Sequence, residues 1–172
     1  AIILNFNCDC NYLLRQYDKH LIDTRHAVAK SIDAQPQSRA WGLFLMAHTV
    51  LLERIEAALS AAQLPPLAWY DVLWELEKAE GGRLRMHELA DRIVMPRYNL
   101  TRLADRIEQA SLIQREDCAD DRRGYFLTIT PAGMQTRKTM WKIYGPQIDA
   151  LFARHLSDTT AAAWGQVLTQ MI

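Results

Sequence analysis

The apolar residues of segment 97–110 recur three or four positions apart, which is the spacing of one helix face. Pro96 stands where such a helix would begin, because proline is tolerated in the first turn of a helix and not in its interior. The apolar face consists of Leu100, Leu103, Ala104 and Ile107, and the other faces carry Arg97, Asn99, Thr101, Arg102 and Arg106. The pattern predicts an amphipathic helix with an arginine-rich surface.

Two short segments after this helix have the composition of strands. Residues 112–115 and 125–130 contain β-branched and aromatic side chains, and the charged stretch CADDRRG (118–124) between them predicts a turn. Thr130 and Pro131 then predict the start of another helix, with threonine as its cap. A helix followed by a β-hairpin is the order of elements in a winged helix-turn-helix.

The chemistry of these residues favours DNA as the partner. Arginine and asparagine offer paired hydrogen-bonding groups that match guanine and adenine edges in the major groove. An arginine at the hairpin tip suits the negative potential of a narrow minor groove. On periodicity alone, a solvated amphipathic helix followed by an ordinary hairpin fits as well.

The preceding residues are predicted to be mostly helical. Residues 38–62 carry a long apolar stripe, and residues 67–79 are apolar on most sides, as in a helix that is buried or shared between subunits. Gly81 and Gly82 interrupt the second helix, and a short strand at 83–85 would pair with the wing.

Two more helices are predicted after the hairpin. The first spans 131–155, with a kink at residues 145–146, and Ser157 or Asp158 caps the second. The second has Trp164, Val167, Leu168 and Met171 on one face. This stripe packs either within the chain or against a second copy; the palindromic sites of dimeric DNA readers favour the second copy.

The predicted fold is therefore mainly α with a small β-wing (α+β). A winged helix-turn-helix domain is flanked by N- and C-terminal dimerisation helices. The predicted parts are an N-terminal extension (1–35), a dimerisation helix (36–63), the DNA-binding domain (64–130) and the C-terminal dimerisation helices (131–172). A further helix is expected at 12–32, either as an arm on the partner subunit or as a weakly ordered leader.

Four stretches resemble the MarR family of bacterial transcriptional regulators. They are LPPLAWYDVLWEL (64–76), RLRMHELADRI (83–93), LTRLADRIEQASLIQRE (100–116) and DDRRGYFLTITPAG (120–133), and their spacing is intact. The resemblance implies a homodimeric regulator that binds double-stranded operator DNA. Residues 87–94 would be its positioning helix and residues 97–110 its recognition helix.

The resemblance also implies roles for single residues. Thr101 and Arg102 match family positions that face DNA. Asp121 and Arg123 match the Asp-x-Arg of the family's wing, in which the Asp orients the Arg for the minor groove, and Arg122 would contact phosphate. The full predicted DNA-contacting set is Arg97, Tyr98, Asn99, Thr101, Arg102, Arg106, Arg122 and Arg123, with Asp121 as wing support.

The sequence departs from the family pattern at several positions. Ser111 stands where the family often has a glycine with positive φ, a conformation that costs serine more. Tyr98 and Asn99 replace small residues, which points to an unusual base preference. Arg85 occupies a helix-cap position where Ser or Thr is common, although Glu88 could still supply half of a capping box. Residues 1–35 carry no part of the resemblance.

The formal net charge is zero, which is unexpected for a DNA-binding protein. However, nine of the arginines lie between positions 83 and 123, and six of them stand against three acidic residues from 83 to 106, so the charge is modestly polarised toward the predicted DNA-binding domain. The neutral total also fits an alternative, a winged helix that docks a protein partner instead of DNA.

No catalytic constellation is present, so we expect no enzyme activity and no cofactor. Cys8 and Cys10 with His20 and His26 lack the spacing of a structural zinc site, and no metal is expected. Cys118 in the wing is either an incidental thiol or an oxidant sensor. A redox-responsive regulator is therefore an alternative form of the function.

Many MarR proteins bind small aromatic acids in a crevice between the dimerisation helices and the DNA-reading part. The resemblance implies a small aromatic or phenolic effector near Trp41, His48, Arg54, Trp69 and Tyr70, although aromatic residues at helical spacing also fit plain core packing. No apolar run approaches the roughly 18 residues of a membrane span. We expect a cytoplasmic bacterial repressor that its effector releases from DNA.

Overall fold

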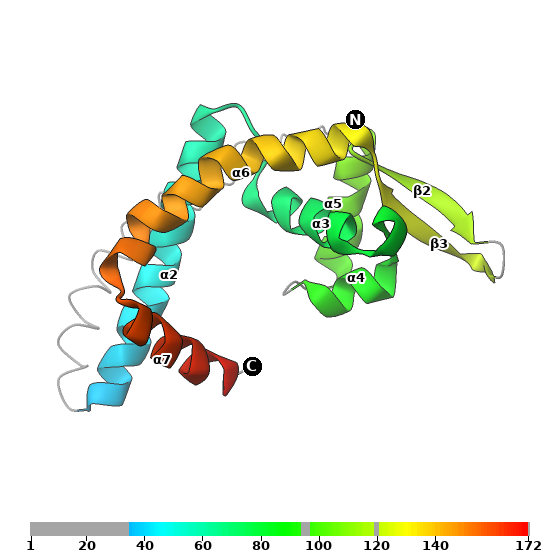
Figure 1. The fold of residues 1–172 in the computed structure, drawn as a ribbon. Coiled ribbons are helices and arrows are strands. Elements are labelled where there is room, and N and C mark those ends of the chain that lie inside the picture. The colour runs from blue at the N-terminus through cyan, green and yellow to red at the C-terminus, as the bar shows by residue number, and fades with distance from the viewer. Residues whose placement is uncertain (1–34, 94–96, 119–120, 172) are drawn as a thin grey trace, which may run out of the picture. The chain divides into compact units, whose positions relative to one another are not determined.

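The computed structural model describes residues 35–93, 97–118 and 121–171 (Figure 1). The helices are α2 (Pro36–Ala61), α3 (Leu67–Lys78), α4 (Met86–Arg92), α5 (Arg97–Gln109), α6 (Pro131–Leu151) and α7 (Asp158–Thr169), with 3-10 turns at Glu80–Gly82 and Ala153–His155. The strands are β1 (Arg83–Arg85), β2 (Ile113–Cys118) and β3 (Asp121–Ile129). The mainly helical fold with a small sheet is as predicted. The helix predicted at 12–32 lies outside the described residues.

The chain divides into two compact units, residues 1–50 and residues 51–172. The described part of the first unit is residues 35–50, which includes the first half of α2. All the other helices and strands named above belong to the second unit.

The three strands form an antiparallel sheet in the order β1-β3-β2. Arg83 pairs with Thr128, so the short strand predicted at 83–85 does pair with the wing. The strands β2 and β3 reach further into the charged stretch 118–124 than predicted, to Cys118 and from Asp121. Backbone hydrogen bonds form the ladder whatever the side chains are, which is why charged residues there can be extended.

One core holds α3, α4, α5 and the sheet together, and we call residues 67–129 the reading head. The predicted apolar face of α5 is confirmed, because its four residues are at most 2% exposed. The buried residues of this core are Val72, Leu73, Leu76, Leu84, Leu89, Leu100, Leu103, Ala104, Ile107, Leu112, Ile113, Leu127 and Ile129. A second core contains Ile55, Leu59, Leu67, Tyr70 and Met140, from α2, α3 and α6.

The chain leaves α5 through a residue in a left-handed conformation. Ser111 has a φ of 60°, so the positive φ expected there is confirmed. Serine pays more than glycine for this conformation, but it ends the helix in the same way. The helix is thus followed directly by β2.

Helix α6 begins as predicted and ends earlier. The Thr130 side chain accepts a hydrogen bond from the Gly133 amide at 3.0 Å, and Pro131 is the first helical residue. The helix continues through Pro146 and ends at Leu151, where residues 152–155 were also expected to be helical. Phe152 leaves the helical region with φ −127° and ψ −61°. Ser157 caps α7, as one of the two predicted alternatives.

Gly133 lies where α6 approaches β2 very closely. A Cβ atom on Gly133 would be 2.1 Å from the carbonyl oxygen of Leu112, an approach that backbone atoms cannot accommodate. The glycine of the Leu-Thr-x-x-Gly motif is therefore required by packing. By contrast, a Cβ atom on Gly165 in α7 would meet nothing within 4 Å.

These two glycines should respond in opposite directions to alanine. We expect Gly133→Ala to lower the free energy of unfolding by about 3 kcal/mol or more, through overpacking against the backbone. Gly165→Ala should raise it by about 0.5–1 kcal/mol, because alanine favours an exposed helix more than glycine does. Urea unfolding followed by circular dichroism measures both, and equal effects would contradict the packing argument.

Candidate nucleic-acid interface

Helix α5 presents an exposed polar face opposite its buried residues. Asn99, Thr101, Arg102 and Arg106 are exposed, while Leu103 on the opposite face is 2% exposed. The side chains of Arg97 and Tyr98 lie outside the described ones, although their backbone is helical. The predicted DNA-contacting side chains that the structure describes therefore lie together on the exposed face of α5.

Helix α4 precedes α5 and begins at a stabilised cap. The amide of Arg85 donates to a carboxylate oxygen of Glu88 at 2.7 Å, so the predicted half of a capping box is confirmed. The helix spans residues 86–92, close to the predicted 87–94. Residues 94–96 between α4 and α5 lie outside the described part of the chain.

The wing follows α5 directly. The backbone of residues 121–123 belongs to β3, next to the bulge at the end of β2. The side chains of Asp121, Arg122 and Arg123 lie outside the described ones, so their roles remain predictions. The outer face of the sheet carries further arginines, because the Arg83 and Arg85 guanidinium groups lie over Phe126, 4.7 and 5.4 Å from the ring centroid.

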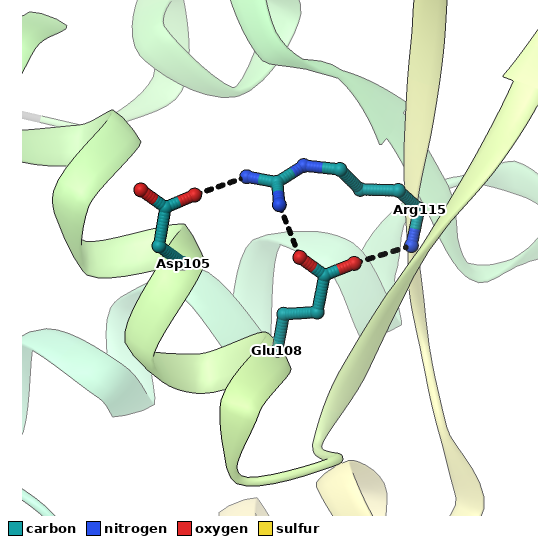
Figure 2. Close-up of polar contacts among 3 residues, drawn as sticks. All are labelled: Asp105, Glu108 and Arg115. Carbon is teal, nitrogen blue, oxygen red and sulfur yellow. Dashed lines mark hydrogen bonds and ion pairs between the residues drawn. The ribbon is translucent and has the colours of Figure 1, made fainter.

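Arg115 on β2 connects the wing to α5 (Figure 2). Its Nη2 atom donates to Asp105 Oδ1 at 2.5 Å, and Nη1 donates to Glu108 Oε2. The backbone amide of Arg115 also donates to Glu108 Oε1 at 3.2 Å. One arginine thus joins two carboxylates of the recognition helix to the strand that follows it.

This cluster also changes the charge of the helix surface. Asp105 and Glu108 would repel DNA phosphates if their charges were not compensated, and Arg115 supplies a positive charge beside both. Burial alone would lower the pKa of Arg115, but hydrogen bonds to Asp105 and Tyr125 and the charge of Glu108 raise it above the ordinary value. The basic Arg102 and Arg106 therefore dominate the exposed face of α5.

Arg115 was not among the site residues predicted from the sequence. Its signal was present: two acidic residues three positions apart on the polar face of α5, followed by a basic residue at the end of the predicted strand 112–115. Only the fold shows that these groups meet, because the pairing depends on how the chain turns at Ser111.

Cys118, at the end of β2, is half-buried and close to a cation. The Arg85 Nη2 atom donates to Cys118 Sγ at 2.9 Å. Among the residues that the structure describes, no group of three or more His, Cys, Asp or Glu side chains could hold a metal ion. Cys8, Cys10, His20 and His26 lie outside these residues.

The residues predicted to contact an effector lie in different surroundings. Trp41, His48 and Arg54 are exposed on α2. Tyr70 is 6% exposed in the second core, whereas Trp69 packs against the first core. The two residues of α3 predicted to contact an effector therefore do not line one surface, and Tyr70 has a clear packing role. No helix of residues 35–93, 97–118 and 121–171 is both long and apolar enough to cross a membrane.

The elements α3 to β3 form a winged helix-turn-helix, and comparisons with known proteins agree. Residues 62–124 match the model of the MarR family. The HTH-type transcriptional regulator PrsX of Escherichia coli is 34% identical over 65 residues, which are 38% of this chain and 39% of PrsX. The match thus spans about two-fifths of that curated relative.

Solved structures share the fold over most of the chain. AbsC, a MarR family transcriptional regulator from Streptomyces coelicolor, has a TM-score of 0.74 and 26% identity, over 80% of this chain and 93% of AbsC. Sco3205 from the same organism, solved in complex with DNA, has a TM-score of 0.75 and 23% identity, over 80% of this chain and 86% of Sco3205. The resemblance is confirmed: residues 62–124 match the MarR family model, and AbsC, a MarR family regulator, shares the fold over 80% of this chain.

Arg115 should matter for stability more than an equally basic exposed residue. We expect Arg115→Gln to lower the free energy of unfolding by about 1–2 kcal/mol, because two carboxylates lose a charged partner that is only partly screened by solvent. Arg106→Gln, on the exposed face of α5, should change it by less than about 0.5 kcal/mol. Urea unfolding of both variants decides this; equal losses would mean that the cluster of Figure 2 does not hold the wing to α5.

Proposed function

We propose that this protein is a DNA-binding transcriptional regulator that acts as a homodimer in the bacterial cytoplasm. It represses transcription by occupying a pseudo-palindromic operator. The observation that carries the proposal is the exposed face of α5, with Asn99, Arg102 and Arg106 opposite a fully buried apolar face. A helix anchored in this way can enter the major groove without disturbing the core.

The proposed contacts divide into two kinds. Asn99, Thr101 and Arg102 contact base edges, since asparagine and arginine can form paired hydrogen bonds with adenine and guanine. Arg122 and Arg123 of the wing contact phosphate and the minor groove, with Asp121 holding Arg123. The remaining proposed contacts are Arg97, Tyr98 and Arg106. Arg115 contributes indirectly, by joining the wing to the recognition helix.

The relatives support this proposal. PrsX is named as an HTH-type transcriptional regulator, and Sco3205 was solved in complex with DNA. These descriptions concern those proteins, and they agree with the chemistry of α5 here.

Exposed apolar side chains support the homodimer. Trp41, Leu43 and Leu45 on α2 are 61%, 54% and 45% exposed, and Val167 and Met171 near the C-terminus are 49% and 71% exposed. Large exposed apolar residues such as these are typical of surfaces that a second subunit covers. Two-fold symmetry then gives two recognition helices for one palindrome.

We also propose that a small aromatic or phenolic effector lowers the affinity for the operator. The exposed Trp41, His48 and Arg54 offer aromatic surface and a cation for a carboxylate. Such an effector acts by binding preferentially to the dimer geometry that fits DNA less well. A panel of aromatic acids added to the operator complex tests this part of the proposal.

The operator itself can be found by selecting fragments of a genomic library at two salt concentrations and sequencing those retained. We expect a palindrome whose half-sites lie about one helical turn apart. Arg102→Ala should weaken the free energy of operator binding by about 1–3 kcal/mol and relax the base preference at one position. Arg123→Ala should weaken binding to many sequences and reduce the salt dependence.

Lys142→Ala, which removes an exposed cation from α6, is the matched control. It should leave the operator affinity and its salt dependence unchanged. Operator affinity that survives the combined loss of Arg102 and Arg123 would refute the DNA-binding assignment. The winged helix would then serve as a protein-interaction module.

Redox control through Cys118 is a second candidate, which its contact with Arg85 favours. Cysteines that sense oxidants lie in partly exposed, electropositive surroundings. If this is correct, peroxide lowers the operator affinity of the natural protein at least several-fold and leaves Cys118→Ser unaffected. A gel-shift titration measures this, with the Cys8→Ser/Cys10→Ser variant as control. Sensitivity that disappears in the control variant instead excludes Cys118 as the sensor.

A further inference from the structure

Arg137 forms a polar link between α3 and α6. It lies on α6 and is only 8% exposed, which is rare for a charged residue. Its Nε and Nη2 atoms donate to the two carboxylate oxygens of Glu77 on α3, at 2.5 and 3.2 Å. A bidentate contact of this kind fixes both the position and the plane of the guanidinium group.

The same guanidinium group contacts a whole face of α3. It lies over Trp74, 5.0 Å from the ring centroid, and it is close enough to Tyr70 to influence the pKa of that hydroxyl. Positions 70, 74 and 77 are four and three residues apart, so they share one face of the helix. Burial raises the pKa of Tyr70, although Arg137 opposes this effect, so the hydroxyl stays protonated near neutral pH. One side chain of α6 thus holds about two turns of α3.

This link lies between the two cores. Val72, Leu73 and Leu76 of α3 are buried in the reading head, while Leu67 and Tyr70 are buried with Met140 of α6. Apolar contacts are not directional and permit small rotations between packed helices. The paired hydrogen bonds between Glu77 and Arg137 oppose such rotations.

A small rotation at this point has a large effect further along the chain. Helix α6 has 21 residues and is therefore about 32 Å long. About 21 Å of this length lies beyond Arg137, so a rotation of about 10° there moves the far end by about 3.7 Å, slightly more than the rise of about 3.4 Å per base pair. In a dimer joined through its terminal helices, the angle between the reading head and α6 therefore determines the distance between the two reading heads.

We infer that Glu77 and Arg137 are a positioning pair that sets the spacing between the two operator half-sites. They contact no DNA in this proposal and act through the angle between α3 and α6. The inference rests on the proposed function, because it needs a dimer that binds two half-sites. It goes further by assigning the choice of spacer length to one buried ion pair.

The test uses the full chain and duplexes with two copies of the selected half-site, separated by spacers of different length. For the natural protein we expect about tenfold preference for one spacer over those one base pair longer or shorter. In Glu77→Gln/Arg137→Met, which leaves no unpaired buried charge, this preference should fall to about twofold. Affinity for a single half-site should not change, because the recognition helix and the wing are intact.

Lys78→Gln is the matched control. Lys78 is the next residue along α3 from Glu77, its ion pair with Glu75 is exposed, and it also lies near Trp74, at 5.6 Å. This variant should keep the spacer preference of the natural protein. An equal loss of preference in Lys78→Gln would show that any change on this helix face has the same effect, and the positioning role would be rejected.

The outcomes separate the two proposals. If the natural protein binds no DNA, the proposed function fails and this inference fails with it. If it binds a palindrome and the double variant keeps the same spacer preference, only the positioning role is overturned. If the double variant does not fold, Arg137→Lys decides: it keeps the charge but loses the paired contact, so it should broaden the preference, and an unchanged preference overturns the inference.

Discussion

Helix α3 has apolar residues on two faces, and both cores of residues 51–172 depend on it. One face closes the reading head, and the other packs against α2 and α6. Among the described helices, α3 alone contributes buried residues to both cores. A helix that is apolar on most sides cannot remain at a surface, so its composition already requires partners on two sides. The sheet, α4 and α5 meet one of these faces, and α2 and α6 meet the other.

The elements of the reading head could be predicted because their signals are local. The apolar face of α5 and the Thr130 cap each depend on residues within one or two turns. The family resemblance added the left-handed conformation at Ser111. The predicted pairing of the strand at 83–85 with the wing joins residues far apart in the sequence. The positions of the exposed residues on α5 followed directly from the buried ones.

Other features could not be predicted, because they depend on contacts between distant residues. Glu77 and Arg137 are 60 positions apart, and nothing in the sequence distinguishes them from the exposed charges nearby. Arg115 meets Asp105 and Glu108 only after the chain has turned. Tyr70 shows the opposite problem: its aromatic character suggested a ligand wall, whereas the structure gives it a place in a core.

The first turn of α6 is tied to the base of the wing. The Thr130 hydroxyl donates to the Ser111 carbonyl oxygen at 2.9 Å, the Thr130 amide donates to Leu112 at 3.0 Å, and Gly133 lies against Leu112. Local opening of a protein proceeds in cooperative units of connected elements. The β-hairpin and the start of α6 therefore form one such unit. A fluctuation that opens the base of the wing therefore also breaks contacts of the first turn of α6, so opening of the wing is coupled to the start of that helix.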